Sequence, residues 1–116
     1  MPSQGDLILI TTHYTDLSAS KKRPVIVVSQ DSYNQSAQDL VVVAMTSTST
    51  INPWTFTITQ ADLVAGTLNR PGQVRCDKVY TLAQSLVVKT FGKVGRPVLL
   101  KIQSLVCKLL EPPQGP

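Results

Sequence analysis

The sequence predicts a mainly β protein, a small, twisted and partly closed antiparallel barrel followed by one C-terminal α-helix. Roughly five or six short segments with β-branched or alternating residues follow one another closely, and one amphipathic segment comes last. The chain has 116 residues, of which 42% are hydrophobic and 16% are charged. This is enough for a core without disulfides or metal. We therefore expect one domain over residues 1–111 and a frayed, proline-rich tail over residues 112–116.

The first half of the chain is expected to hold three strands. Residues 7–10 are apolar and lead into polar residues 11–14, as in a strand that leaves the core. Residues 15–22 are small, polar and then basic, which indicates a surface loop. A proline precedes the β-branched strand 25–28, where it removes no ladder hydrogen bond. Residues 29–36 are rich in turn formers, and residues 39–45 return as a buried strand.

The second half begins with hydroxyl residues 46–50, and the clean alternation over 55–59 predicts a strand with one wet face. Residues 61–66 indicate a short helical turn or loop, and residues 69–72 a turn. A last strand, or two short ones, is expected over 86–94.

The helix is expected to begin at residues 95–97, because proline suits a first helical turn. Its apolar residues recur every three or four positions and form one broad face that the prolines at 112 and 113 end. They are Leu99, Ile102, Val106 and Leu109, joined by Leu105 and Leu110.

Residues 72–82 form the stretch with the most informative pattern. If it is extended, Arg75 and Asp77 project from one face while Val74 and Cys76 point inward. The alternation weakens after Asp77, so we expect a bulge or a strand end there.

The composition narrows the function classes. The net charge is +4 and the isoelectric point is about 9.3, which favours an anionic partner such as nucleic acid. The longest apolar run, residues 40–45, is too short to cross a bilayer, and the N-terminus lacks the pattern of a signal peptide. We expect a cytoplasmic protein without membrane association. Cys76 and Cys107 are expected to be reduced core residues, and no metal or other cofactor is expected.

Polar residues flank the predicted strands at Arg23, Thr46, Arg75 and Asp77. Strand ends converge in a small barrel, so these residues are candidates for one cleft. Two guanidiniums suit a phosphate, because each offers a planar fork of donors and stays charged. Three lysines would widen the positive rim: Lys21, Lys22 and Lys78.

These residue types fit metal-free RNA cleavage, which needs a base for the 2′-hydroxyl, cationic donors for the phosphorane and a proton for the leaving oxygen. Asp77, Arg75 with Arg23, and Thr46 are candidates for these roles. We expect Arg75 to stabilise charge first, since its pKa makes it a poor acid.

Several of these candidate residues also fit purely structural roles. Residues 21–23 also fit a solvated loop, residues 46–50 a turn that satisfies its own backbone, and Asp77 a partner that only holds Arg75. His13 is the one side chain that titrates near neutral pH, and it is more often a strand-end residue than a catalyst.

Four blocks in this order resemble the MazF/PemK toxin family: residues 5–9, 22–29, 42–47 and 74–78. With the C-terminal helix, the resemblance spans residues 5 to 110. It implies an SH3-like barrel, a homodimer, and a ribosome-independent endoribonuclease that cuts single-stranded RNA at short sequences. It also implies a MazE/PemI-like antitoxin whose flexible tail covers the RNA groove, and DNA binding through the complex with that antitoxin.

The resemblance also implies site residues. Arg23 and Thr46 match residues that are catalytic in many members, and Arg75 and Asp77 match the Arg-Cys-Asp block of the PemK/Kid-like branch, where the pair is assigned the acid and base roles. Lys21, Lys22, Ser47 and Lys78 are the expected RNA-binding residues. One departure is the first loop, where members often carry His-Glu-Gln or Ser-Glu-Gln and this chain has residues 17–20 without a histidine or glutamate. Slower or differently specific cutting, or dependence on the arginines alone, would follow.

The leading hypothesis is thus a sequence-selective, metal-independent RNA endonuclease toxin that leaves 2′,3′-cyclic phosphate ends. One alternative is a non-catalytic toxin similar to CcdB that binds a protein such as gyrase, because a fold does not fix a function. Another is an RNA-binding relative without activity. Clustered phosphate donors at Arg23 and Arg75 favour the nuclease, since a protein-poisoning surface does not need them.

Overall fold

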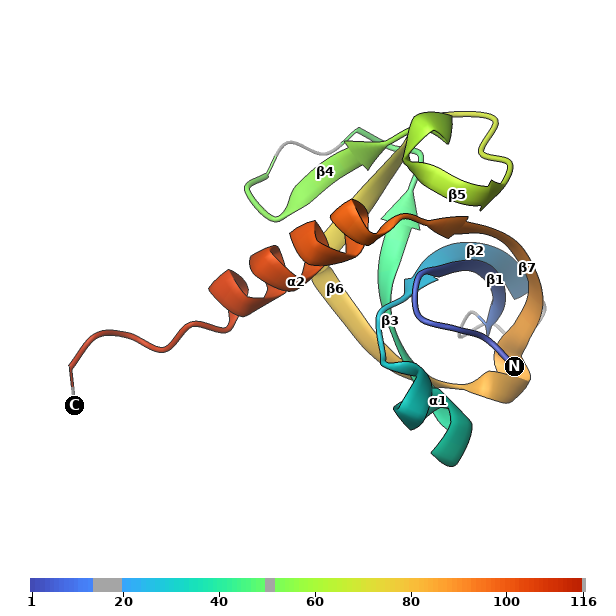
Figure 1. Cartoon of the computed structure of the whole chain (residues 1–116), viewed down its shortest axis with the longest axis horizontal. Coiled ribbons are helices and arrows are strands. Elements are labelled where there is room, and N and C mark those ends of the chain that lie inside the picture. The colour runs from blue at the N-terminus through green and yellow to red at the C-terminus, as the bar shows by residue number, and fades with distance from the viewer. Residues whose placement is uncertain (14–19, 50–51, 116) are drawn as a thin grey trace.

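The computed structural model describes residues 1–13, 20–49 and 52–115. In these residues seven strands form one sheet with the order β4-β6-β3-β2-β1-β7-β5, and every pairing is antiparallel. The sheet curls into a half-barrel with a helix at the C-terminal end (Figure 1), which confirms the predicted fold class. The strands are β1 (Asp6–His13), β2 (Ser20–Val27), β3 (Asp39–Thr46), β4 (Thr55–Ile58), β5 (Leu63–Gly66), β6 (Gly72–Ala83) and β7 (Val87–Val94).

The C-terminal helix α2 (Arg96–Leu109) begins as predicted, with Gly95 at its N-cap and a proline in its first turn. It buries Val98 and Ile102 against the sheet, and the chain beyond it runs away from the body (Figure 1). Leu110 lies beyond the last helical turn and is 72% exposed, so the prediction that it joins the apolar face was wrong. No helix in the described residues is long and apolar enough to span a membrane.

The core consists of two clusters on opposite faces of the sheet. One contains Val43 and the helix residue Ile102, and the other contains Val42 and Leu40. Because successive residues of a strand point to opposite faces, β3 is buried on both sides. This explains why its sequence is a continuous apolar run rather than an alternating one, and it confirms the predicted buried strand.

The segment 29–36 was predicted as a turn, but it contains the short helix α1 (Asp31–Ser36). Tertiary hydrogen bonds explain the difference. Asn34 is fully buried, donates from Nδ2 to the carbonyl of Ser29 at 3.0 Å, and accepts a bond from the Ser29 hydroxyl. These bonds fix one turn of helix among residues that also suit a loop.

Three further expectations need correction. Residues 20–22 lie in β2, where they pair with β1, and not in a loop, while residues 14–19 lie outside the described residues. The segment 61–66 is not simply a helical turn or loop, because a 3-10 turn, η1 (Gln60–Asp62), leads into β5, which pairs with β7. Cys107 is exposed on α2, whereas Cys76 is buried as expected. A second 3-10 turn, η2 (Gln84–Leu86), joins β6 to β7.

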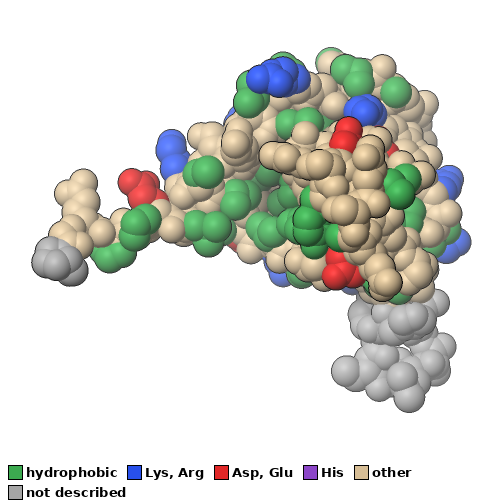
Figure 2. All heavy atoms as spheres, turned by 60° about the horizontal axis from the view of Figure 1, so that its bottom comes forward, with side chains coloured by type: hydrophobic (Ala, Val, Ile, Leu, Met, Phe, Trp, Pro, Cys, Tyr) green, Lys and Arg blue, Asp and Glu red, His purple; other side chains and the backbone are tan. Residues whose placement is uncertain are grey.

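A groove of about 570 Å³ lies next to α2, and its lining combines apolar side chains with Gln4, Gln30, Arg96 and Gln103. Hydrophobic side chains gather where the projecting helix leaves the body (Figure 2). Val79 of β6 and Leu100 of α2 line this groove and are 42% and 48% exposed. We call this surface the helix groove.

Candidate functional site

Arg23, Thr46 and Arg75 line one cavity of about 720 Å³, although they come from three different strands, β2, β3 and β6. Lys78 lines it as well. We call it the central cavity. The structure therefore brings together three of the four predicted catalytic residues and one predicted RNA-binding lysine, and their roles stay predictions.

The strand register explains this convergence. Val25 pairs with Ala44, and Ala44 pairs with Arg75 on its other side. Arg23 lies two residues before Val25 and Thr46 two residues after Ala44, so the three polar side chains share one face of the sheet. The pairing of β2 with β3 stops after Val25 and Ala44. The next residue, Pro24, has no N–H to continue the ladder, which favours the opening between the two strands.

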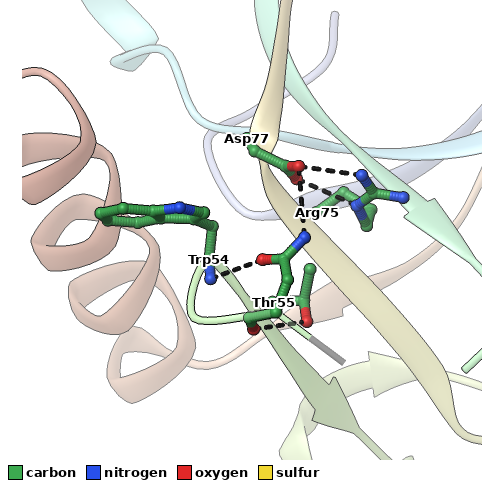
Figure 3. Close-up of polar contacts among 5 residues, drawn as sticks. Trp54, Thr55, Arg75 and Asp77 are labelled. Carbon is green, nitrogen blue, oxygen red and sulfur yellow. Dashed lines mark hydrogen bonds and ion pairs between the residues drawn. The ribbon is translucent and has the colours of Figure 1, made fainter. Parts of the chain in front are cut away.

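Asp77 holds the Arg75 guanidinium with two hydrogen bonds. Nε donates to Oδ1 at 2.9 Å and Nη2 donates to Oδ2 at 2.8 Å, as the dashed lines of Figure 3 show. The two side chains are only 19% and 23% exposed. Nη1 takes no part in this pair. The predicted pair thus exists as a bidentate contact, which orients the guanidinium as well as neutralising it.

The pair shifts both ionisation equilibria. The hydrogen bond from Arg75 lowers the pKa of Asp77 to about 2 against the opposing effect of burial, and a weaker bond from Asn52 Nδ2 at 3.5 Å acts in the same direction. The same bond raises the pKa of Arg75 above its usual value. Both groups are therefore charged at neutral pH, and Asp77 in the free protein is a weak base.

A local irregularity in β6 positions Asp77. Val43 pairs with Val79, but the next residue of β3, Ala44, pairs with Arg75, so residues 76–78 have no partner on β3. Of the two predicted alternatives, the bulge is therefore confirmed, and the strand end is wrong because β6 continues to Ala83. The N–H of Cys76 donates instead to the carbonyl of Trp54 at 3.0 Å.

The turn before β4 completes the surroundings of Asp77. Asn52 Oδ1 accepts a bond from the N–H of Trp54 at 2.7 Å, and the Asn52 carbonyl accepts one from the Thr55 hydroxyl at 3.2 Å. Figure 3 shows Trp54 turned toward α2 and away from Arg75. Asn52 therefore links the turn to the carboxylate.

Cys76 lies between the two charged residues in sequence but points into the core. Burial is the main cause that raises the pKa of its thiol to about 11, and the charge of Asp77 adds to it. A neutral, buried thiol is a poor nucleophile, so Cys76 is a packing residue.

The other predicted RNA-binding residues do not line the central cavity. Ser47 lines an adjoining cavity of about 500 Å³, together with Thr46. Lys21 and Lys22 are exposed on β2, beside Thr12 and Thr11 of β1. His13 is the last residue of β1, and its side chain lies outside those that the structure describes.

The sequence interpretation missed Tyr80, which lines the central cavity and is 45% exposed. Tyr80 pairs with Val42 and Arg75 with Ala44, and residues two apart in β3 share a face. An unbroken alternation along β6 would have put Tyr80 and Arg75 on opposite faces. Only the register shift at residues 76–78 reverses this, and its size is not visible in the sequence.

Within the described residues, no three His, Cys, Asp or Glu side chains lie close enough together to hold a metal ion. The groups in and beside the central cavity are guanidinium, ammonium, hydroxyl and carboxylate groups.

Comparison with known proteins identifies related sequences and folds. The family model of the PemK-like, MazF-like toxins of type II toxin-antitoxin systems matches residues 3–110. No curated protein gives a significant match.

Among solved structures, the chain resembles an endoribonuclease in complex with its cognate antitoxin from a mycobacterial species. The two chains are 22% identical, the TM-score is 0.74, and the alignment covers 99% of this chain and 100% of that one. A second mycobacterial endoribonuclease has 23% identity and a TM-score of 0.75, with 98% of this chain and 95% of that chain covered. MazE-MazF from Deinococcus radiodurans has 21% identity and a TM-score of 0.78, with 94% and 95% covered. At these identities the structures establish the fold.

Proposed function

Because the chain belongs to the PemK-like, MazF-like toxins of type II toxin-antitoxin systems, we propose that it is a sequence-selective, metal-independent and ribosome-independent endoribonuclease that cuts single-stranded RNA. The observation that carries this proposal is the meeting of Arg23, Thr46 and Arg75 in one cavity. Two guanidiniums and a hydroxyl in one cavity can bind a phosphodiester and stabilise the negative charge of its transition state.

The proposed reaction is an internal transfer. The 2′-oxygen of a ribose attacks the adjacent phosphorus, the bond from phosphorus to the 5′-oxygen breaks, and the products are a 2′,3′-cyclic phosphate and a 5′-hydroxyl. Arg23 and Arg75 stabilise the added negative charge, and Thr46 donates a hydrogen bond to a phosphate oxygen. Asp77 accepts the proton of the 2′-hydroxyl. Arg75 donates a proton to the leaving 5′-oxygen, helped by the negative charge of the transition state.

The Arg75 to Asp77 pair imposes a condition on this mechanism. While both bonds from Arg75 are intact, Asp77 has a pKa of about 2 and accepts protons poorly. A phosphate bound by the remaining N–H groups of Arg75 would share the positive charge of the guanidinium with Asp77. Its arrival would weaken the bonds to Asp77 and raise the basicity of the carboxylate, so the base becomes effective when substrate is bound.

The same proposal includes the partners expected of such a toxin. A MazE/PemI-like antitoxin would neutralise it by covering the cationic central cavity with an acidic, flexible tail. Through that complex the toxin would associate with DNA. We place the protein in the cytoplasm, where its RNA substrate and antitoxin would meet it.

A homodimer is also part of the proposal, and the helix groove supports it. Val79 and Leu100 are large apolar residues that line one groove and stay well exposed in the single chain. Large exposed apolar side chains beside polar ones are typical of a protein interface. A second copy of the chain is the partner that the family membership suggests.

The test is cleavage of a long single-stranded RNA by the purified protein in the presence of a metal chelator. We expect fragments with 2′,3′-cyclic phosphate ends at one short recurring sequence. Arg75→Ala should slow cutting by about 10²- to 10³-fold, whereas Lys108→Ala, which removes one charge from the end of α2, should leave it unchanged. Intact RNA over a wide range of wild-type enzyme would contradict the proposal and favour a non-catalytic toxin.

A further inference from the structure

We propose that the RNA continues from the central cavity around the end of β3 onto a second binding surface, where Arg70 and Lys89 bind its phosphates and Phe91 contacts a base. This inference rests on the proposed RNA-cleaving function. We call the surface around these three residues the flanking surface. It would bind nucleotides next to the cleaved bond and not the cleaved phosphate itself.

The first observation is a continuous path. A second cavity of about 500 Å³ shares Pro24, Met45 and Thr46 with the central cavity. A third, of about 420 Å³, shares Leu9 and Phe91 with the second. Single-stranded RNA that leaves the central cavity past Thr46 can therefore continue through the second and third cavities.

The path passes from one face of the sheet to the other. The central cavity lies on the face of Ala44, as the register of Arg75 shows. Met45, the next residue of β3, packs with Val43 in the core cluster of the opposite face and lines the second cavity. Pro24, Met45 and Thr46 line both cavities, so the flanking surface adjoins the central cavity there, whereas Arg70, Lys89 and Phe91 do not line the central cavity.

The second observation is the chemistry of the lining. Arg70 lines the second cavity and Lys89 the third, and Phe91 lines both. Among the described residues that line the three cavities, none is an aspartate or glutamate. Cations that follow the backbone, with an aromatic ring for a base, are the usual means of binding single-stranded nucleic acid. Asn69, which also lines both cavities, adds an amide that can contact a base edge.

The third observation is that the structure fixes this surface. Gln60 Oε1 accepts a bond from the N–H of Leu68 at 2.7 Å, and Gln60 Nε2 donates to the carbonyl of Gly66 at 3.1 Å. Gly66 has a φ of +81°, and a Cβ there would lie 2.2 Å from the Phe91 carbonyl oxygen. The segment that carries Arg70 is thus held directly against the strand that carries Phe91 and Lys89.

The experiment compares two RNA substrates that share one cleavage site. The short one covers only the nucleotides at the cut, and the long one extends them on both sides. KM and kcat are measured for Arg70→Ala, Lys89→Ala and the double variant. Lys108→Ala is the matched control, since Lys108 is an exposed cation that lines none of these cavities.

We expect the double variant to raise KM several-fold for the long RNA and to leave kcat unchanged. The contacts that it loses would stabilise the bound substrate and the transition state equally. The slope of log KM against log salt should flatten by about 0.7 for each phosphate that the variant no longer binds. On the short RNA the double variant should match wild type. Phe91→Leu should weaken binding of the long RNA by on the order of fivefold or more, with a thermal melt to verify folding.

A double variant that behaves as Lys108→Ala on the long RNA would overturn the inference. So would a variant that loses affinity for the antitoxin but keeps full affinity for long RNA, because the surface would then bind protein. Wild-type activity on the short RNA tests the proposed function separately. If wild type neither cuts nor binds either RNA, the proposed function fails and this inference fails with it.

Discussion

Arg75 and Asp77 lie two residues apart on β6, and the Asp77 carboxylate takes both the Nε and the Nη2 hydrogen bonds of the guanidinium, at 2.9 and 2.8 Å. The pair therefore couples the orientation of the proposed charge stabiliser to the basicity of the proposed base. In the absence of substrate, Asp77 fixes the orientation of Arg75 and Arg75 lowers the basicity of Asp77.

The substitution Asp77→Asn separates these two roles. The asparagine side chain would keep an oxygen that accepts a bond from Arg75 but would not accept a proton from the 2′-hydroxyl. We expect kcat to fall by about 10²-fold or more, with a smaller change in KM. Single-turnover cleavage of a short RNA measures this. If Asp77→Asn kept the wild-type kcat, Asp77 would not be the base and would only hold Arg75 in place.

The pair also makes stability depend on pH in a defined direction. The pKa of Asp77 is lowered from 3.8 to about 2, so the folded state gains stability from the charged carboxylate above pH 3.8. That gain disappears as the pH falls through about 2. Because the pair is partly exposed, we expect wild type to exceed Asp77→Asn by about 1 kcal/mol at pH 7. Urea unfolding at pH 7 and at pH 2 measures the difference, and an equal gap at both values would contradict the assignment.

Gly66→Ala tests the rigidity of the flanking surface. The new Cβ would overlap the Phe91 carbonyl oxygen, and the φ of +81° disfavours any side chain. We expect a loss of at least about 2 kcal/mol in the free energy of unfolding. Gly115→Ala is the control, since it also has a positive φ but no atom lies within 4 Å of its added Cβ. Equal stability of the two variants would show that β5 does not pass as close to β7 as described.

The homodimer proposal predicts a different effect at two similar valines. Val79 of β6 lines the helix groove and is 42% exposed, whereas Val88 of β7 does not line it and is 44% exposed. Val79→Glu should produce a monomer, because it places a charge in the proposed interface. Val88→Glu should leave the dimer intact. Light scattering during size-exclusion chromatography measures the mass, and a dimer in both variants would exclude the helix groove as the interface.

Much of the fold and of the central cavity follows from local sequence patterns. The period-two pattern predicts that Arg75 and Asp77 share a face, and that Val74 and Cys76 are buried. The proline and β-branched residues 24–28 predict a strand next to Arg23, although β2 begins earlier, at Ser20, and contains both Arg23 and Pro24. These features depend on neighbours in the chain, so a single sequence contains them.

Other features depend on contacts between distant segments, and the sequence interpretation missed them. Tyr80 reaches the central cavity only through the register shift at residues 76–78. The helix α1 depends on the burial of Asn34 against Ser29. The flanking surface needs Gln60 to hold the segment before β6 against β7. No local pattern in the chain specifies such pairings.

The central claim is that Arg23 and Arg75, from different strands, act on one phosphate in the absence of metal. The most direct test is kcat/KM for cleavage of a short single-stranded RNA in chelator by wild type, Arg23→Ala, Arg75→Ala and the double variant. We predict a loss of about 10²- to 10³-fold for each single variant, and a loss for the double variant that is smaller than the product of the two. Wild-type kcat/KM in both single variants, or losses that multiply independently, would contradict the claim.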